Sequence, residues 1–141
     1  MTTLNLKDAG LLKSLCYING EWLGANAASV IHVTNPATGV VITTVPRLGK
    51  DETQHAIDGA SDALNGWKAR TAEERGRVLR RWYELMMAHQ DDLALIMTSE
   101  QGKPLAEAKG EIAYAASYIE WFSEEARRVY GEMVPSPWHD K

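Results

Sequence analysis

Short apolar runs rich in β-branched residues occupy the first third of the chain. Four of them are predicted as strands, because such residues suit a pleated, half-buried surface: 16–18, 21–23, 30–34 and 40–45. Asn19 and Gly20 separate the first two runs, and both tolerate a positive φ, which predicts a two-residue hairpin turn. The segment Asn-Pro-Ala-Thr-Gly at 35–39 predicts the turn between the last two runs.

After these strands the apolar residues recur at helical spacing. A first helix is expected to begin at Asp51 or its neighbour and to end at Gly66. A second helix is expected after Thr71, because Thr71 and Glu74 have the spacing of a capping box, in which each side chain bonds the other residue's backbone amide.

Two further helices are predicted around a break at Gly102 and Pro104. The pair Asp91-Asp92 is expected to start the third helix. Gly102 can adopt the left-handed conformation that closes a helix, and Pro104 prevents the helix from continuing. A long fourth helix then carries apolar positions over 105–129.

The fourth helix is expected to end at Gly131 and Pro135. The predicted fold class is therefore mainly α with a small N-terminal β-hairpin or meander. We expect two parts: residues 1–48 with the hairpin and strands, and residues 49–141 as a helical layer.

The fourth helix is apolar on more than one side. Ile112, Ile119 and Phe122 form one stripe, whereas Tyr114, Tyr118 and Trp121 point elsewhere. A second apolar face predicts a second packing partner.

Charge and composition exclude some classes of function. The net charge of −4 argues against a nucleic-acid surface, which requires a basic excess. No apolar run approaches the roughly 20 residues of a membrane helix, and the first residues do not resemble a signal peptide. Cys16 is the single cysteine, so no internal disulfide can form and a cytoplasmic location is expected.

Catalytic and cofactor motifs are absent from the sequence. It contains no G-x-G-x-x-G, phosphate loop, C-x-x-C, H-E-x-x-H or G-x-S-x-G motif. Cys16 has no neighbouring histidine or basic cluster, so we interpret it as a small, partly buried apolar residue rather than a nucleophile. Five arginines of the segment 70–81 could suggest an anion site, but they alternate with glutamates at helical spacing, which favours an ion-paired, solvated face.

Several segments together resemble the N-terminal region of the aldehyde dehydrogenase superfamily, closest to succinate-semialdehyde dehydrogenases. They are Ile-Asn-Gly-Glu-Trp at 18–22, Asn-Pro-Ala-Thr-Gly at 35–39, Glu-Gln-Gly-Lys-Pro at 100–104, the run from Tyr114 to Phe122, and 130–135. The run from Tyr114 to Phe122 points most narrowly to the semialdehyde branch. Such enzymes are several times longer than this chain.

The resemblance implies the chemistry of an NAD(P)-dependent dehydrogenase. A cysteine thiolate would attack the aldehyde, a hydride would pass to NAD or NADP, and a glutamate-activated water would release the acid. The resemblance places all of these groups beyond residue 141, so no catalytic or cofactor-binding residue is expected in this chain, and the chain alone is expected to bind no cofactor and to be inactive.

The resemblance also implies two peripheral roles for residues of this chain. Gly110 and Tyr114 match positions of a long helix that lines one side of the substrate tunnel. The backbone carbonyl of Thr34 and the carboxylate of Glu100 match two ligands of a structural monovalent cation. For Tyr114, ordinary helix packing remains an equal alternative.

Two interpretations of the whole chain remain open. In the first, it is the N-terminal portion of a semialdehyde dehydrogenase that packs against the cofactor and catalytic domains of the same enzyme and forms a homo-oligomer. In the second, it is a freestanding, non-enzymatic helical interaction module derived from that family. Neither interpretation predicts a nucleic acid or a membrane as partner.

Overall fold

The computed structural model describes residues 4–24 and 29–139. Their secondary structure is a short 3-10 turn, two strand pairs and four helices, in this order: η1 (Ala9–Leu11), β1 (Cys16–Ile18), β2 (Glu21–Leu23), β3 (Val30–Thr34), β4 (Val41–Pro46), α1 (Lys50–Lys68), α2 (Ala72–Ala88), α3 (Gln90–Gln101) and α4 (Leu105–Glu125). The predicted fold class, mainly α with a small N-terminal β part, is confirmed.

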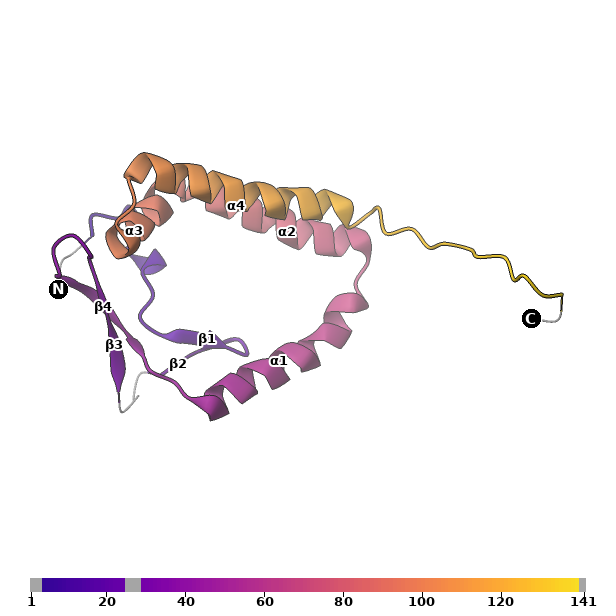
Figure 1. Ribbon diagram of the computed structural model, residues 1–141, viewed down its shortest axis with the longest axis horizontal. Helices are drawn as coiled ribbons and strands as arrows, with labels where there is room; N and C mark the ends of the chain where they lie inside the picture. The colour runs from indigo at the N-terminus through magenta and orange to yellow at the C-terminus, as the bar shows by residue number, and fades with distance from the viewer. Residues whose placement is uncertain (1–3, 25–28, 140–141) are drawn as a thin grey trace.

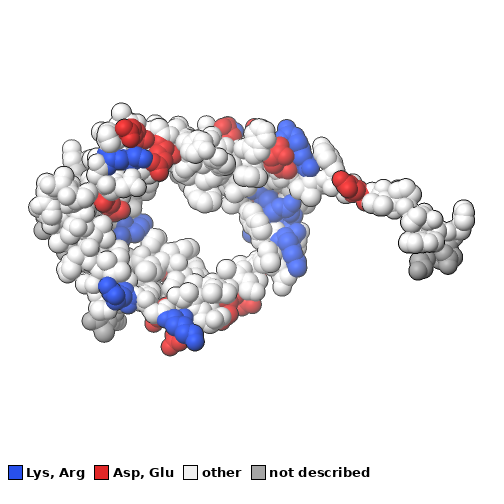
Figure 2. Space-filling view, in the orientation of Figure 1, with Lys and Arg blue, Asp and Glu red and all other residues white. Residues whose placement is uncertain are grey.

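The elements are arranged as an open ring (Figure 1). Helices α2 and α4 lie side by side along one side, and α1 runs along the opposite side. The β1–β2 hairpin lies beside α1, and the β3–β4 pair closes the ring near α3. The space-filling view shows that side chains leave the centre of the ring open (Figure 2).

Both strand pairs are antiparallel, and each forms a separate two-stranded sheet. In the hairpin, Asn19 and Gly20 have φ values of 49° and 88°, so the predicted two-residue turn is confirmed. In the second pair, Val33 faces Thr43 while Thr34 faces Val41, so the register shifts by one residue near the turn.

The helix starts follow local chemistry. Thr71 caps α2 as predicted: the Glu74 amide donates to its hydroxyl at 3.3 Å, and the Glu74 carboxylate accepts from the Thr71 amide at 2.8 Å. Helix α1 begins one residue before Asp51. Gly49 is its N-cap, and the Gly49 amide donates to the Glu52 carboxylate at 2.8 Å. Gly102 closes α3 with a φ of 82°, as predicted.

Two predicted helix ends are wrong. Helix α1 continues past Gly66 to Lys68, because Gly66 lies on an exposed turn where a glycine costs only about 1 kcal/mol. Helix α4 ends at Glu125 rather than at Gly131. The segment 129–134 includes side chains such as Val129 and Met133 that are 81% and 98% exposed, so no packing holds it in a helix.

The core is small. Its main cluster joins α3 and α4 through Ala94, Ala108 and Ile112, with Leu93 and Met97 packed against it. The chain exposes 10541 Å², whereas a compact monomer of 15.6 kDa exposes about 7,200 Å². Among the described residues, no helix combines the length and the apolar composition needed to cross a bilayer.

Candidate functional site

One face of α4 carries the residues that the sequence singled out for substrate contact. Gly110, Tyr114 and Tyr118 are four residues apart and therefore lie above one another on this face. A β-carbon at Gly110 would meet nothing within 4 Å. Tyr114 and Trp121 are 63% and 61% exposed, so this face has no partner within the described part of the chain.

Tyr114 and Tyr118 form a hydroxyl pair. Their oxygens are 2.7 Å apart, and their rings meet edge to face with centroids 5.1 Å apart. The hydrogen bond to Tyr114 raises the pKa of Tyr118 above its ordinary value of 10.0. The Tyr118 phenol therefore stays protonated at neutral pH. Since one hydroxyl donates within the pair, the proton of the other can be donated to an oxygen of a ligand.

These side chains line a groove of about 650 Å³, within the size range of small-molecule sites. Every lining residue belongs to α4: Tyr114, Ser117, Tyr118, Glu120, Trp121, Phe122 and Glu124. A groove with a single helix as its wall needs another element to enclose a ligand. Phe122, which shares a stripe with Ile112 and Ile119 in the sequence, is 58% exposed and lines this groove as well as the space beside Leu79 of α2.

The structure brings together the two segments that hold the predicted cation ligands. Thr34 is the last residue of β3, Glu100 lies in the last turn of α3, and the two elements are in contact. A β-carbon on Gly102 would lie 2.8 Å from Pro36 Cγ, so the end of α3 packs directly on the turn after β3. Within residues 4–24 and 29–139, no three His, Cys, Asp or Glu side chains converge on a common metal position.

Three arginines of α2 are ion-paired, as the sequence predicted, namely Arg77, Arg80 and Arg81, whereas Arg75 donates to the backbone carbonyl of Arg70. Arg80 contacts Glu120 of α4 at 2.9 Å and Glu84 at 3.5 Å. Arg81 also contacts Glu84, at 3.6 Å. Figure 2 shows positive and negative side chains adjacent to one another where α2 and α4 run together. This surface is therefore a charged face that joins two helices.

Cys16 shows no sign of a nucleophilic site. It is half-buried at the start of β1, directly opposite Leu23 in the hairpin. Its placement fits the interpretation of a small apolar residue.

The sequence missed one group of polar contacts. Asp92 was predicted only to start a helix, but its carboxylate accepts hydrogen bonds from the backbone amides of Lys7 and Asp8. The partners are 84 and 85 residues apart in the chain, so no local pattern could have indicated this contact. The sequence feature that pointed to this position was the pair of acidic residues Asp91-Asp92 at the start of a helix.

Comparison with known proteins identifies the family of the chain. Residues 22–141 match the model of the aldehyde dehydrogenase family. The chain belongs to the aldehyde dehydrogenase family. Within it, the chain is 62% identical over 138 residues to a glutarate-semialdehyde dehydrogenase of Pseudomonas putida. It is 57% identical over 138 residues to the NADP(+) succinate-semialdehyde dehydrogenase of Escherichia coli K12.

The family fold is also that of this chain. The crystal structure of an aldehyde dehydrogenase from Brucella melitensis superposes with a TM-score of 0.92 at 58% identity, over 96% of this chain and 28% of the other. The two enzymes from Pseudomonas putida and Escherichia coli are each covered to 29% of their length, while 98% of this chain is matched. The chain thus corresponds to the N-terminal portion of these longer dehydrogenases.

Proposed function

We propose that this chain acts as the N-terminal part of an NAD(P)-dependent dehydrogenase that oxidises succinate semialdehyde, or a close aldehyde such as glutarate semialdehyde, to the carboxylic acid. The observation that carries the proposal is identity of 57–62% over 138 residues with enzymes named for these two substrates. Both substrates are short aldehydes with a distal carboxylate, so the proposal concerns a single chemical class.

The proposed contribution of this chain is one wall of the substrate tunnel. Gly110 leaves space beside the helix, and Tyr114 supplies an aromatic surface with a hydroxyl one turn later. In this proposal, the part of the enzyme that follows α4 supplies the opposite wall and encloses the groove. Burial of the aromatic side chains then gives the tunnel an apolar lining that excludes water.

The residues of this chain do not fit a dinucleotide. A pyrophosphate is bound by the amides of a glycine-rich turn between a strand and a helix. Within residues 4–24 and 29–139, the sheets are antiparallel pairs, and the turn from β4 to α1 contains a single glycine, Gly49. We therefore assign NAD(P) binding, and the hydride transfer that it supports, to the part of the longer enzyme that this chain does not match.

The cation site is a further part of the proposal. The Thr34 carbonyl and the Glu100 carboxylate lie on adjacent segments, and both residues are exposed. Two oxygen ligands of this kind suit a monovalent cation only if further ligands complete the shell. We propose that a backbone carbonyl from the enzyme's remaining part does so.

The exposed surface favours this function over a freestanding interaction module. Helix α1 contains no buried residue, and its Ile57 and Leu64 are 57% and 55% exposed. Exposed apolar residues of this extent mark surfaces that are covered in the working protein. A cytoplasmic location stays a prediction from the single cysteine.

A chimera tests the proposed function. The chain replaces the matched N-terminal portion of the Escherichia coli enzyme, and kcat/KM is measured for succinate and glutarate semialdehydes with NAD and NADP. We expect an active oligomer that oxidises at least one of the two. A chimera with wild-type oligomeric state and heat stability that oxidises neither would contradict the proposal.

The tunnel assignment is tested in the same chimera. Tyr114→Ala should raise KM about fivefold to tenfold, because an aromatic contact contributes about 1 kcal/mol. Tyr17→Ala is the matched control, since Tyr17 is equally exposed but lies in the hairpin. Equal KM values for the two variants would show that Tyr114 serves packing alone.

A further inference from the structure

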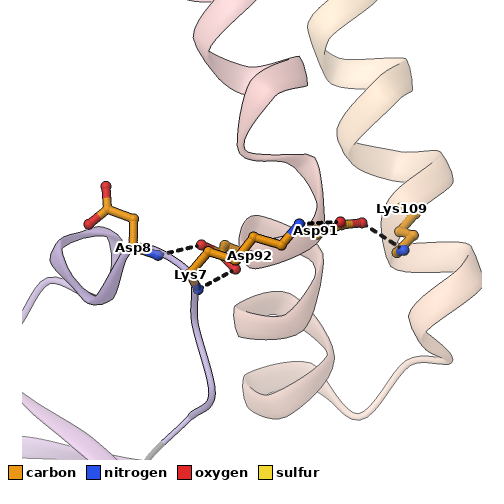
Figure 3. Close-up of polar contacts among 5 residues, drawn as sticks. All are labelled: Lys7, Asp8, Asp91, Asp92 and Lys109. Atoms are coloured by element: carbon orange, nitrogen blue, oxygen red, sulfur yellow. Dashed lines mark hydrogen bonds and ion pairs between the residues drawn. The ribbon is translucent and has the colours of Figure 1, made fainter.

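The N-terminal arm, which we define as residues 4–15, is held to the helices by one carboxylate. Figure 3 shows the arm passing the start of α3, where Asp92 points towards it. The backbone amides of Lys7 and Asp8 donate to the two Asp92 oxygens at 3.0 Å and 2.8 Å. Asp92 is only 4% exposed, so the carboxylate end of these two bonds is largely shielded from water.

A second contact links the arm to α4. The Lys7 ammonium donates to Asp91 at 2.9 Å, and the other oxygen of Asp91 contacts the Lys109 ammonium at 2.7 Å. Gln90 donates from its side chain to the Lys109 carbonyl at 3.0 Å. The arm, α3 and α4 thus meet at the first turn of α3. The α4 residue at this junction, Lys109, directly precedes Gly110.

Apart from these contacts and the Lys13 ammonium, which lies 5.0 Å from the centre of the Trp22 ring in β2, the arm is weakly packed. None of the three residues of η1 is buried, and the arm pairs with no strand in the described part of the chain. Beneath it lies a shallow groove of about 330 Å³ between α3 and α4, lined by Asn5, Leu6, Lys7, Asp91, Asp92, Leu95, Leu105 and Lys109. A segment with few buried contacts opens at a lower free energy than the core.

We propose that the N-terminal arm is a strap, fastened by Asp92, that opens and closes as a unit while α2, α3 and α4 stay folded. Opening uncovers Leu95 and Leu105 at the junction of α3 and α4. It also frees the segment that leads directly into Cys16 at the start of β1.

Asp92 and Asp91 have different roles in this strap. Asp92→Asn keeps one oxygen that can accept but replaces the other with an NH2 group, so one of the two backbone amides loses its acceptor and the other loses the charge of its acceptor, which is costly. Asp91 has a half-exposed side chain and binds two mobile ammonium groups, and such surface pairs contribute little. Replacement of Asp92 should therefore open the strap, while replacement of Asp91 should leave it closed.

Limited proteolysis of the chain tests this difference. Trypsin cleavage after Lys13, followed by mass spectrometry, is compared for the wild type, Asp92→Asn and the matched control Asp91→Asn. We expect roughly tenfold faster cleavage in Asp92→Asn, from the loss of two charge-assisted hydrogen bonds, and less than threefold in Asp91→Asn. The helical circular dichroism should be equal in all three. Equal cleavage rates in the two variants would overturn the assignment to Asp92.

Hydrogen exchange of the wild-type chain tests the strap without a variant. The Lys7 and Asp8 amides should exchange with a lower free energy of opening, and a weaker dependence on urea, than the core amides of Ala108 and Ile112. Exchange of both sets with the same free energy and the same urea dependence would mean that the arm opens only in global unfolding, and would overturn the proposal.

Discussion

Gly76 of α2 lies directly against the backbone of Ser123 of α4. A β-carbon on Gly76 would lie 2.8 Å from the backbone carbonyl oxygen of Ser123. Because that neighbour is backbone, it cannot move aside without shifting α4. The absence of a side chain at Gly76 therefore sets the separation of the two helices that form one side of the ring.

Gly76→Ala should destabilise the chain. The added methyl group forces α2 and α4 apart at a cost of about 1–3 kcal/mol, which outweighs the gain of about 1 kcal/mol in helix propensity. Urea unfolding followed by circular dichroism measures the change. Gly66→Ala in α1 is the control: a β-carbon there meets nothing within 4 Å, so this variant should gain up to about 1 kcal/mol. A stabilised Gly76→Ala would show that the helices are farther apart than described.

Acid should weaken the attachment of the arm. Hydrogen bonds from Lys109 and Lys7 lower the pKa of Asp91 from 3.8 to about 2. The backbone amides of Lys7 and Asp8 lower the pKa of Asp92, and the charges of Lys7 and His89 act in the same direction.

The sign of the pH effect follows from these shifts. A lowered pKa means that folding favours the ionised carboxylate, so the stabilisation is complete above about pH 4 and is lost as pH falls towards 2. The urea midpoint should therefore decrease over this range, and less steeply in Asp92→Asn. Identical pH profiles for the wild type and Asp92→Asn would contradict the prediction.

The isolated chain should associate through the aromatic face of α4. Tyr118 and Trp121 are 50% and 61% exposed, and apolar patches of this kind seek a partner. Trp121→Glu should shift sedimentation towards the monomer, because burial of the new charge is unfavourable. Tyr130→Glu is the control, since it places the same charge on an exposed aromatic residue outside α4. A stable monomer at high concentration would favour the freestanding module.

The chain alone should neither bind NAD(P)+ nor oxidise succinate semialdehyde. The described residues offer no phosphate-binding turn, and Cys16 lies in a hairpin opposite Leu23. Calorimetry with each dinucleotide measures binding, and absorbance of NAD(P)H measures turnover, with Cys16→Ala as control. Saturable binding, or turnover above that of the control, would show that the chain holds a site of its own.

The features predicted correctly from the sequence depend on local chemistry. The Asn19-Gly20 turn, the Thr71 cap and the Gly102 terminus each follow from contacts within about four residues. The family resemblance adds what local chemistry could not, the assignment of Gly110 and Tyr114 to a substrate tunnel, and that assignment stays a prediction.

The features that could not be predicted depend on distant partners. The apolar pattern of the fourth helix continues to Val129, but a helix needs packing to continue, and α4 ends at Glu125. Likewise, Asp92 looks like any acidic residue at a helix start until the arm, 84 residues away, is placed beside it. Phe122 shares a stripe with Ile112 and Ile119 but is 58% exposed, because periodicity cannot tell how much of an apolar face packs inside the chain.

The packing of α2, α3 and α4 also has a consequence for the order of events during synthesis. These three helices follow one another in the sequence and contact one another, with partners such as Arg80 and Glu120 lying 40 residues apart, so all their mutual interactions fall within residues 72–125. In the longer dehydrogenase proposed above, synthesised at about 5–20 residues per second, these helices would be complete before the rest of the polypeptide. Until the part of that enzyme after α4 has been synthesised, the aromatic face of α4 would stay exposed to solvent. It would then be a binding site for a chaperone on the nascent chain.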